Sequence, residues 1–292
     1  MHEPVMTGEV VEFLLANRGG VFVDCTVGAG GHARALLEAG ADRIIGVDRD
    51  PGALRMARER LAQWGDRVQL VHGDYRALAR VLDERDLDRV QGIVADLGVS
   101  SMQLDGEGRG FSFQRDEPLD MRMDPTGGLT AAELIAGASE RELADAIFEY
   151  GEERHSRRVA RAIVRARTDG PVTTTGQLAA IVRRAVPGRG WQRIDPATRT
   201  FQAIRIWVNG ELEDLDRFLE TACRRLQPGG RLVVITFHSL EDRIVKHTLR
   251  SIAQRGETAI RVLTKKPVRP GEAELERNAR ARSAKLRAAE AA

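Results

Sequence analysis

The sequence predicts an α/β fold in which a parallel sheet is interrupted by a helical insertion. Short, continuously apolar runs alternate with helical patterns over the first hundred residues. This alternation stops near Ser100 and resumes after about Glu211. Such strands, separated by helices, are typical of a parallel sheet that helices cover on both faces. We therefore expect one sheet domain, residues 1–104 and 212–292, and one insertion of loops and helices, residues 105–211.

Four strands are expected before the insertion, and each ends near a candidate site residue. Their apolar runs are Val21–Val23, Arg43–Val47, Val68–His72 and Val90–Ala95. Helices are expected at His32–Ala39, from Pro51 to about Trp64, and at Arg76–Leu82. Pro51 fits the start of the second of these helices, because proline is tolerated in a first helical turn. Ligands of open parallel sheets bind at the carboxyl ends of the strands.

The pattern after the insertion predicts the rest of the sheet. A helix at Leu212–Leu226 is expected to stop at Pro228-Gly229-Gly230, and a fifth strand and its helix follow at Arg231–Phe237 and from Leu240 to about Gln254. A final hairpin is expected between Ala259–Leu263 and Ala284–Arg287. The alanine-rich end of the chain is expected to fray.

Composition indicates an ordinary globular protein of the cytoplasm. Hydrophobic residues make up 42% of the 292 residues and charged residues 30%, and the net charge is +2. No apolar run approaches the ~20 residues of a membrane span, and the first residues do not resemble a secretory signal. Only two cysteines are present, Cys25 and Cys223, without metal-ligand spacing. We therefore expect no disulfide framework, no metal and no membrane partner.

A glycine turn between the first strand and the first helix is the main candidate for a cofactor site. It runs from Asp24 to His32 and contains Gly28, Gly30 and Gly31. Glycine is needed where a backbone turns tightly or approaches a ligand. Asp48 closes the second strand twenty residues after Gly28, and such a carboxylate can accept both ribose hydroxyls of an adenosine cofactor.

The turn discriminates between two adenosine cofactors. A dinucleotide site favours G-x-G-x-x-G, which brings a pyrophosphate to a helix N-terminus. Here the glycines are crowded and the third spaced position is Ala33. The leading Asp24 suits a cationic ligand better than a pyrophosphate. The turn therefore favours S-adenosylmethionine (AdoMet) over NAD, and the fold class is a Rossmann-like class I AdoMet-dependent methyltransferase sheet with a helical insertion domain.

Two further strand ends support this site. Tyr75 follows the third strand, where an aromatic ring can lie against adenine. Asp96 ends the fourth strand, where the reactive methyl group is expected, and it is the third acid on this edge after Asp24 and Asp48. Tyr75 as a core residue and Asp96 as a turn cap remain open alternatives.

Longer motifs carry a resemblance to a known family. They are Asp96–Asp105, Arg109–Phe113, Pro118–Asp124, Pro196–Asn209, Phe237–Lys246 and Asn278–Ser283. With the opening His2–Val5, these blocks extend over nearly the whole chain. The chain resembles the MraW family of bacterial 16S ribosomal RNA (cytosine-N4)-methyltransferases.

The resemblance implies an AdoMet-dependent enzyme that methylates the exocyclic N4 of a cytosine in the decoding region of small-subunit (16S) rRNA. Its partner would be 16S rRNA within a small ribosomal subunit or its precursor. The oligomeric state stays open, a dimer included. The cofactor contacts that the resemblance implies carry over onto Gly30, Gly31, His32, Asp48, Tyr75, Asp96 and Gln103.

Asp96 is the candidate catalytic residue. The lone pair of a cytosine amine is delocalised, and a carboxylate that accepts its N–H helps to localise that pair. Methylation at carbon 5 would need a thiolate nucleophile, and the positions of Cys25 and Cys223 argue against it. His238 is a weaker candidate as a proton acceptor or an RNA contact. The alternative is a helix-entry role for His238, with Ser239 as the N-cap.

The insertion carries the candidate RNA contacts. Between Arg154 and Arg199 there are eleven arginines and two acids, and an unbalanced arginine face is typical of a phosphate track. Arg154, Arg157, Arg158, Arg161 and Arg165 recur at spacings of three or four, which places them on one helix face. Arg109, Arg199 and Arg205 are expected to contact the target nucleotide or its phosphates, with structural ion pairs as the alternative. Aromatic residues are only 4%, so base stacking would rest on residues such as Phe111, Phe113 or Trp191.

Two other function classes stay open at this point. One is a non-catalytic RNA-binding or assembly factor that retains an AdoMet fold. The other is methylation of DNA at N4 or N6.

Overall fold

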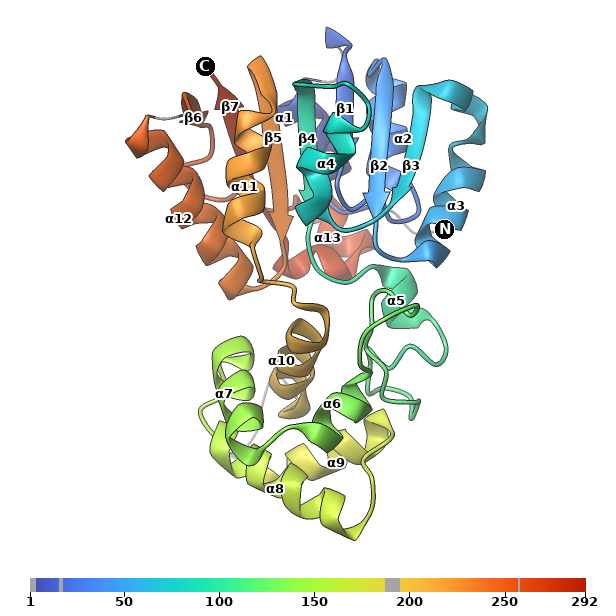
Figure 1. Ribbon diagram of the computed structural model, residues 1–292, viewed down its shortest axis with the longest axis vertical. Helices are drawn as coiled ribbons and strands as arrows, with labels where there is room; N and C mark the ends of the chain where they lie inside the picture. Colours follow the sequence, from blue (N-terminus) through green and yellow to red (C-terminus); the bar gives the residue numbers. More distant parts are fainter. Residues whose placement is uncertain (1–3, 16–17, 187–194, 257) are drawn as a thin grey trace. The chain divides into compact units, whose positions relative to one another are not determined.

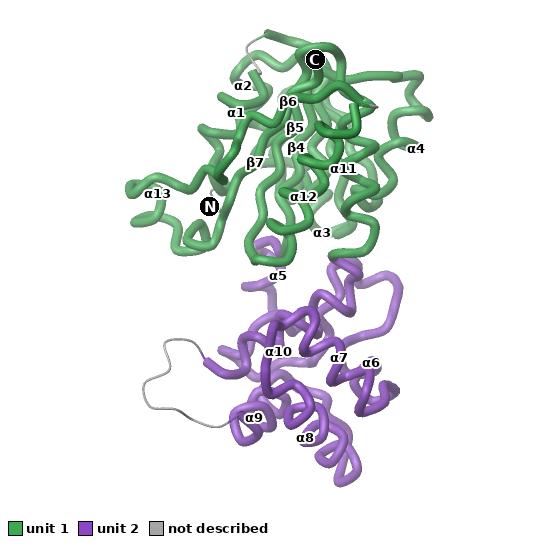
Figure 2. The backbone as a smooth tube through the Cα atoms, turned by 90° about the vertical axis from the view of Figure 1, so that its left-hand side faces the viewer, with its two compact units in different colours: residues 1–98, 212–292 green, residues 99–211 purple. Residues whose placement is uncertain are grey.

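The computed structural model describes residues 4–15, 18–186, 195–256 and 258–292. The chain forms two compact units, one of residues 1–98 and 212–292 and one of residues 99–211 (Figure 2). Trp191, singled out above for base stacking, lies outside the described residues. Within the described residues, no helix has the length and apolar character that a membrane crossing requires.

The first unit is built on a seven-stranded sheet with the order β3-β2-β1-β4-β5-β7-β6 (Figure 1). The strands are β1 (Val21–Asp24), β2 (Arg43–Asp48), β3 (Val68–His72), β4 (Val90–Asp96), β5 (Leu226–Thr236), β6 (Ile260–Val262) and β7 (Lys285–Ala291). The first five strands run parallel, and β7 runs antiparallel to both β5 and β6. The predicted Rossmann-like fold class is confirmed.

Pairing along the sheet brings three acids to one edge. Asp24 ends β1 in register with Gly46 of β2 and Val94 of β4. Asp48 and Asp96 therefore lie two residues beyond it, at the carboxyl ends of their own strands. The carboxyl edge of the sheet is thus lined by acids from three adjacent strands.

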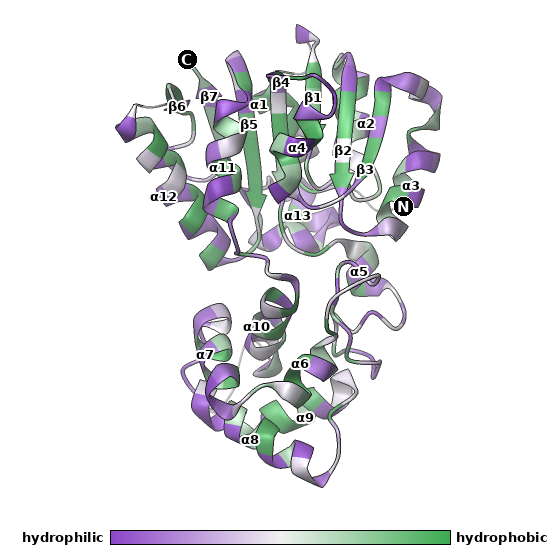
Figure 3. Cartoon of the chain, in the orientation of Figure 1, coloured by the Kyte–Doolittle hydropathy of each residue, from purple (hydrophilic) through white to green (hydrophobic). Residues whose placement is uncertain are grey.

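Helices cover both faces of the sheet and enclose one core on each side. They are α1 (Thr7–Leu14), α2 (Gly31–Ala39), α3 (Pro51–Arg60), α4 (Leu78–Asp83), α11 (Leu215–Arg224), α12 (Ser239–Arg255) and α13 (Glu272–Arg277). Phe22 packs in the core with α1, α2 and α3, and its neighbour Val23 packs in the core with α4, α11 and α12. Successive side chains of a strand point to opposite faces, which explains why the central runs of the strands, such as residues 93–95 of β4 and 232–235 of β5, are continuously apolar (Figure 3).

The second unit is helical and has its own core. Its helices are α5 (Ser101–Asp105), α6 (Ala131–Gly137), α7 (Glu140–Gly151), α8 (Ser156–Asp169), α9 (Thr175–Ala185) and α10 (Ala197–Asn209). Four of them begin with a capping box, formed by Ser100, Thr130, Ser139 and Thr174 with the Gln or Glu three residues on. These reciprocal bonds satisfy backbone donors that a helix start leaves open. The side chains of Leu143, Ile163, Leu178 and Ile204 pack together without exposure.

Three expectations about the end of the chain were wrong. Pro228-Gly229-Gly230 does not precede the fifth strand but lies inside β5, where the pairing with β4 shifts between Leu226 and Arg231. The alanine-rich end does not fray, because β7 lies between β5 and β6 and buries Ala288 and Ala289. The hairpin exists in another register, with Ile260 opposite Ala291. Small side chains on this strand let helices and neighbouring strands pack closely.

Candidate active site at the carboxyl edge of the sheet

The glycine turn is joined to the second strand through Asp48. The backbone N–H of Gly28 donates to Oδ2 of Asp48 at 2.7 Å, and the N–H of Asp50 donates to Oδ1 at 2.9 Å. A carboxylate offers about four acceptor positions, so each oxygen retains capacity for a ribose hydroxyl. Burial raises the pKa of Asp48, and the two backbone hydrogen bonds oppose that rise.

The three glycines of the turn are required for different reasons. Gly28 has a φ of +52°, and a Cβ there would meet nothing nearer than the Thr26 carbonyl oxygen at 3.9 Å. A Cβ on Gly30, with a φ of +82°, would lie 3.0 Å from Cδ1 of Leu61, and one on Gly31 would lie 2.7 Å from Cγ of Pro4. Gly28 leaves open space beside the turn, whereas Gly30 and Gly31 permit close packing within the protein. Cofactor contact by these glycines stays a prediction.

Asp24, at the end of β1, is a fully buried acid with an unsatisfied oxygen. Its Oδ1 accepts the backbone N–H of Thr26 at 3.2 Å, but its Oδ2 has no hydrogen-bond partner among the described residues. Burial raises the pKa of Asp24 to about 7, and the negative charge of Asp48 adds to this rise. Such a buried oxygen fits a cationic or hydrogen-bond-donating ligand.

Asp96, at the end of β4, is hydrogen-bonded to the glycine turn. Its backbone N–H donates to Oγ1 of Thr26 at 2.6 Å. Its side chain is 23% exposed, yet Oδ1 is buried and without a hydrogen-bond partner in the part of the chain described. Burial raises the pKa of Asp96 well above its ordinary value, and the charges of Asp24 and Glu241 add to the rise.

His32, in the first turn of α2, lies beside Asp96 as a neutral ring. Its Nε2 lies 2.8 Å from the carbonyl oxygen of Val5, which can only accept, so Nε2 carries the hydrogen. Its Nδ1 is 4.0 Å from Oδ2 of Asp96. Burial lowers the pKa of His32. The ring therefore presents an acceptor atom, not a positive charge, to Asp96.

Tyr75 and its surroundings form the side of the site next to β3. The Tyr75 ring is buried and packs against Phe218 of α11, with 4.8 Å between ring centroids. The preceding Asp74 is paired with Arg49 and Arg76. Core packing and a ring available to adenine are compatible for a residue in this position, and the adenine contact stays a prediction.

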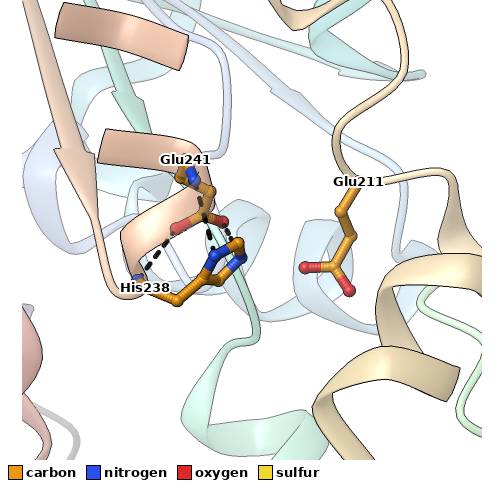
Figure 4. Close-up of side chains that lie close together, drawn as sticks. All are labelled: Glu211, His238 and Glu241. Atoms are coloured by element: carbon orange, nitrogen blue, oxygen red, sulfur yellow. Dashed lines mark hydrogen bonds and ion pairs between the residues drawn. The ribbon is translucent and has the colours of Figure 1, made fainter. Parts of the chain in front are cut away.

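His238 begins α12 and forms a capping box with Glu241 (Figure 4). Its Nδ1 accepts the backbone N–H of Glu241 at 3.4 Å, and its Nε2 is 3.2 Å from Oε1 of Glu241. Oε2 of Glu241 accepts the backbone N–H of Phe237 and of His238. The expected helix-entry role of His238 was therefore wrong in one detail, since His238 and not Ser239 is the N-cap of α12. A capping role accounts for Nδ1, whereas Nε2 is buried without a hydrogen-bond partner among the described residues, and the proton-acceptor role of His238 stays a prediction.

The predicted site residues of the insertion belong to the second unit. Gln103 is buried and completes the capping box of α5, with its Oε1 accepting the backbone N–H of Ser100 at 2.9 Å. Arg109 donates to the carbonyl oxygens of Arg122 and Met123, both at 3.0 Å. Arg205 forms two hydrogen bonds with the carboxylate of Glu211, at 2.8 and 2.7 Å. All three side chains thus have structural partners.

The arginines of α8 lie on its exposed side. Arg157, Arg158, Arg161 and Arg165 are exposed, while Val159, Ala160 and Ile163 are buried in the core of the second unit. Arg161 approaches Glu140 at 3.4 Å. The predicted run of five is shorter within the helix, because Arg154 precedes α8.

Arg199, in α10, is likewise 55% exposed. Its Nη1 approaches the carbonyl oxygen of Glu152 at 3.4 Å and the carboxylate of Glu153 at 3.9 Å. Contact between any of these arginines and RNA stays a prediction.

Sequence reasoning missed three groups of the site. Thr26 links the turn to β4, Glu241 lies against the start of α12, and Glu274 of α13 accepts the backbone N–H of Met6 at 2.8 Å. The S/T-x-x-E form of a capping box could have indicated Glu241 only if histidine were counted as a cap. Nothing local marks Glu274, because its place follows from the packing of α13.

The residues present fit the cofactor that the turn indicates. AdoMet carries a ribose, for which Asp48 retains acceptor positions, and two positive charges, for which Asp24 and Asp96 offer buried oxygens without partners among the described residues. The open space beside Gly28 allows the backbone of the turn to be approached.

The chain was also compared with known proteins. Residues 1–292 match the MraW methylase family. A ribosomal RNA small subunit methyltransferase H of Geobacter sulfurreducens is 53% identical over 305 residues, covering 99% of this chain and 98% of that protein. One of Sorangium cellulosum is 54% identical over 288 residues, covering 99% and 90%. A solved rRNA methylase of Streptococcus thermophilus is 13% identical, covers 100% of this chain and 98% of that one, and has a TM-score of 0.43.

The match extends over the whole chain, and half of the residues are identical to those of the first two relatives. A methylase with this sheet and this turn uses S-adenosylmethionine as its cofactor. The chain belongs to the MraW methylase family.

Proposed function

We propose that this protein transfers a methyl group from AdoMet to the exocyclic N4 of a cytosine in the decoding region of small-subunit rRNA. Its substrate would be 16S rRNA within a small ribosomal subunit or its precursor. Relatives about 50% identical over nearly the full chain carry the name ribosomal RNA small subunit methyltransferase H, which supports rRNA methylation. The observation that carries the finer proposal is the placement of Asp96 at the end of β4, with an oxygen available to an amine.

Cofactor binding would divide among residues of the turn and the strand ends. Asp48 would accept the ribose hydroxyls, Gly28 would leave room for the cofactor beside the turn, and Tyr75 would border the adenine. The other proposed contacts are Gly30, Gly31, His32, Asp96 and Gln103. The bound cofactor supplies an electrophilic methyl group on a positively charged sulfur.

Asp96 would orient the amine for in-line attack. Its carboxylate accepts one N–H of the cytosine amine, which turns the nitrogen lone pair toward the methyl group. The hydrogen bond from its backbone N–H to Thr26 fixes the position of Asp96 relative to the cofactor turn. Holding donor and acceptor in an attack geometry can contribute roughly 7–11 kcal/mol to lowering the barrier.

The two cysteines argue against methylation at carbon 5. Both thiols are buried. Burial raises the pKa of Cys25 well above its ordinary value and that of Cys223 to about 12. The nucleophile in that reaction is a thiolate. Because a raised pKa keeps both thiols protonated, neither cysteine is suited to that role.

The exposed arginines of α8 would bind the phosphate backbone of the RNA. Arg157, Arg158 and Arg161 of α8, and Arg154 and Arg199 outside it, are exposed and place positive charge on the surface of the second unit. Arg109 and Arg205, expected to contact the target nucleotide or its phosphates, also have partners within the second unit, so a structural role stands beside the RNA contact, which stays a prediction. The scarcity of aromatic residues favours recognition of folded RNA over single-strand stacking.

A methylation assay tests the proposal. Small subunits from cells that lack this protein are incubated with the purified protein and AdoMet, and mass spectrometry maps the methylated nucleosides of the rRNA. We expect one N4-methylated cytosine in the decoding region. AdoMet binding with no methylation of rRNA would contradict the enzyme, and preferential methylation of duplex DNA in a competition assay would contradict the substrate.

Variants of Asp96 test the chemistry. Asp96→Asn keeps the size of the side chain but removes its charge, and we expect kcat to fall by at least about a hundredfold, in line with the loss of a positioned catalytic group. Undiminished turnover in Asp96→Ala, with unchanged AdoMet affinity, would show that another group orients the amine.

A further inference from the structure

The first unit gathers four acids around the end of β4. The negative charges of Asp24, Glu241 and Glu274 all act on the carboxyl group of Asp96. Asp24 is fully buried, and Glu241 is 1% exposed. One oxygen each of Asp24 and Asp96 is buried without a hydrogen-bond partner among the described residues. This acid cluster (Asp24, Asp96, Glu241 and Glu274) therefore contains two buried oxygens that accept no hydrogen bond from any of the described residues.

In the part of the chain that the structure describes, the groups that face Asp24 and Asp96 from each packed element supply no compensating positive charge. From β2, Asp48 adds a negative charge to the surroundings of Asp24, and the Cys25 thiol is buried next to it. From α2, His32 faces Asp96 as a neutral ring.

The remaining neighbours are also acidic or already satisfied. From α12 and α13, Glu241 and Glu274 face Asp96, and their own acceptors hold backbone N–H groups of Phe237, His238 and Met6. Among the described residues, no lysine or arginine acts on either carboxyl group.

We propose that Asp24 and Asp96 make the site selective for the positive charge of its cofactor, by holding a proton in the free protein and releasing it when AdoMet binds. AdoMet carries a positive sulfonium and a positive ammonium group, whereas the product S-adenosylhomocysteine keeps only the ammonium. Binding of AdoMet therefore releases more protons than binding of the product. This inference rests on AdoMet being the cofactor, but not on which RNA receives the methyl group.

The burial and charges of the acid cluster support the coupling of AdoMet binding to proton release. Burial raises the pKa of Asp24 to about 7 and raises that of Asp96 as well, so the cluster binds protons near neutral pH in the absence of a cation. A positive charge within a few ångströms favours the ionised form of a carboxyl group. Affinity for the cation and loss of the proton are then linked, and each raises the other.

The same charge balance applies during the reaction. The carbon–sulfur bond breaks, its electron pair stays on sulfur, and a carbon–nitrogen bond forms to the amine. The sulfonium charge disappears, so the proton affinity of Asp96 rises at the step in which the amine nitrogen must lose a proton. The N–H bond breaks, and the proton passes to Asp96. The site ends with a neutral thioether beside a protonated cluster, which no longer attracts the sulfur.

Titration calorimetry in two buffers measures the released protons. The protein is titrated with AdoMet and separately with S-adenosylhomocysteine at pH 6.5, in phosphate and in imidazole buffer, and the difference in apparent enthalpy gives the number of protons. With a pKa near 7, roughly three quarters of the molecules carry the Asp24 proton at this pH. We expect AdoMet to release at least that fraction and the product distinctly less. Equal release by both ligands would overturn the proposal.

A matched pair of variants assigns the proton to the cluster. Asp24→Asn keeps the acceptor for the backbone N–H of Thr26 and removes the ionisable group, and we expect it to reduce proton release by AdoMet by about three quarters of a proton at pH 6.5. Asp66→Asn, on the exposed 3₁₀ segment Ala62–Arg67, is the control and should leave the release unchanged. Unchanged release in Asp24→Asn would contradict the assignment to Asp24.

The wild-type protein provides a second readout that needs no variant. For one linked proton with a pKa near 7, the Kd for AdoMet should fall about tenfold between pH 6 and pH 8, and the Kd for S-adenosylhomocysteine should fall less. Parallel pH dependences for the two ligands would overturn charge selectivity. A protein that bound AdoMet in this way but methylated no rRNA would contradict only the proposed function.

Discussion

The backbone N–H of Asp96 donates a hydrogen bond to the side-chain hydroxyl oxygen of Thr26 at 2.6 Å, across seventy residues of sequence. The N–H of Thr26 in turn donates to Oδ1 of Asp24 at 3.2 Å. Through its side chain and its backbone, Thr26 therefore couples the ends of β1 and β4, two of the three strands whose acids line the carboxyl edge of the sheet. A cofactor held by the turn and an amine oriented by Asp96 would be placed relative to each other through this residue.

We predict that Thr26→Val lowers both stability and turnover, whereas Thr26→Ser retains most of both. Valine has the shape of threonine without the hydroxyl acceptor, so the N–H of Asp96 loses its partner at a cost of about 1–3 kcal/mol. Urea denaturation gives the free energy of unfolding, and single-turnover methylation gives the rate. A Thr26→Val enzyme with wild-type stability and rate would show that this hydrogen bond does not position Asp96.

We predict that Asp24→Asn stabilises the free protein at high pH but much less at low pH. The pKa of Asp24 rises from 3.8 to about 7 in the folded protein, so between these values the folded state binds more protons than the unfolded state. Its stability therefore falls as the pH rises through this window. The advantage of Asp24→Asn over the wild type should grow by on the order of 3 kcal/mol between pH 5 and pH 8.

The measurement for this prediction is urea denaturation of both proteins across that pH range. Asp66→Asn serves as the control, because Asp66 is exposed. A stability difference between wild type and Asp24→Asn that did not change with pH would mean that Asp24 titrates normally.

We predict that neutralising two arginines of α8 weakens RNA binding and its salt dependence. In Arg157→Gln/Arg158→Gln, the slope of log K against log salt should decrease by up to about two, one for each phosphate that an arginine no longer neutralises. Arg55→Gln/Arg58→Gln on α3, a pair that is also exposed, is the matched control. Filter binding of small-subunit RNA at several salt concentrations measures the slopes. If both pairs reduced the slope equally, the effect would come from net charge and not from α8.

We predict that Arg205 acts through the fold of the second unit. Its guanidinium pairs with Glu211, whose side chain is 5% exposed. Arg205→Gln breaks the ion pair with the buried carboxylate of Glu211, and breaking a buried pair typically costs about 3–5 kcal/mol. Arg205→Met/Glu211→Met removes both charges and should recover most of the stability. Thermal denaturation of the wild type and both variants tests this prediction. A fully stable Arg205→Gln protein with impaired RNA binding would contradict it and would support a direct contact between Arg205 and RNA.

Three acids of the site could be predicted because their positions depend on local pattern and on one topological rule. Asp24, Asp48 and Asp96 each close an apolar run, and parallel strands bring their carboxyl ends to one edge. The reasons for individual residues were harder to predict. Gly30 and Gly31 matched a cofactor motif, yet the Cβ positions meet Leu61 and Pro4. Spacing along the chain does not distinguish glycine needed by a ligand from glycine needed by a neighbouring side chain.

The sequence by itself determined the alternation of strands and helices, the interruption after the fourth strand, the turn and its acids, and the resemblance to a methylase family. The spacing of apolar residues and the positions of strand ends are properties of short segments, so they can be predicted without knowing which other segments lie beside them in the fold. Only the tertiary structure decided that Thr26 supports Asp96, that His32 is neutral beside it, and that the alanine-rich end is a buried strand. These features depend on which distant groups meet in an interior from which water is excluded, and burial there sets both hydrogen-bond partners and proton affinity.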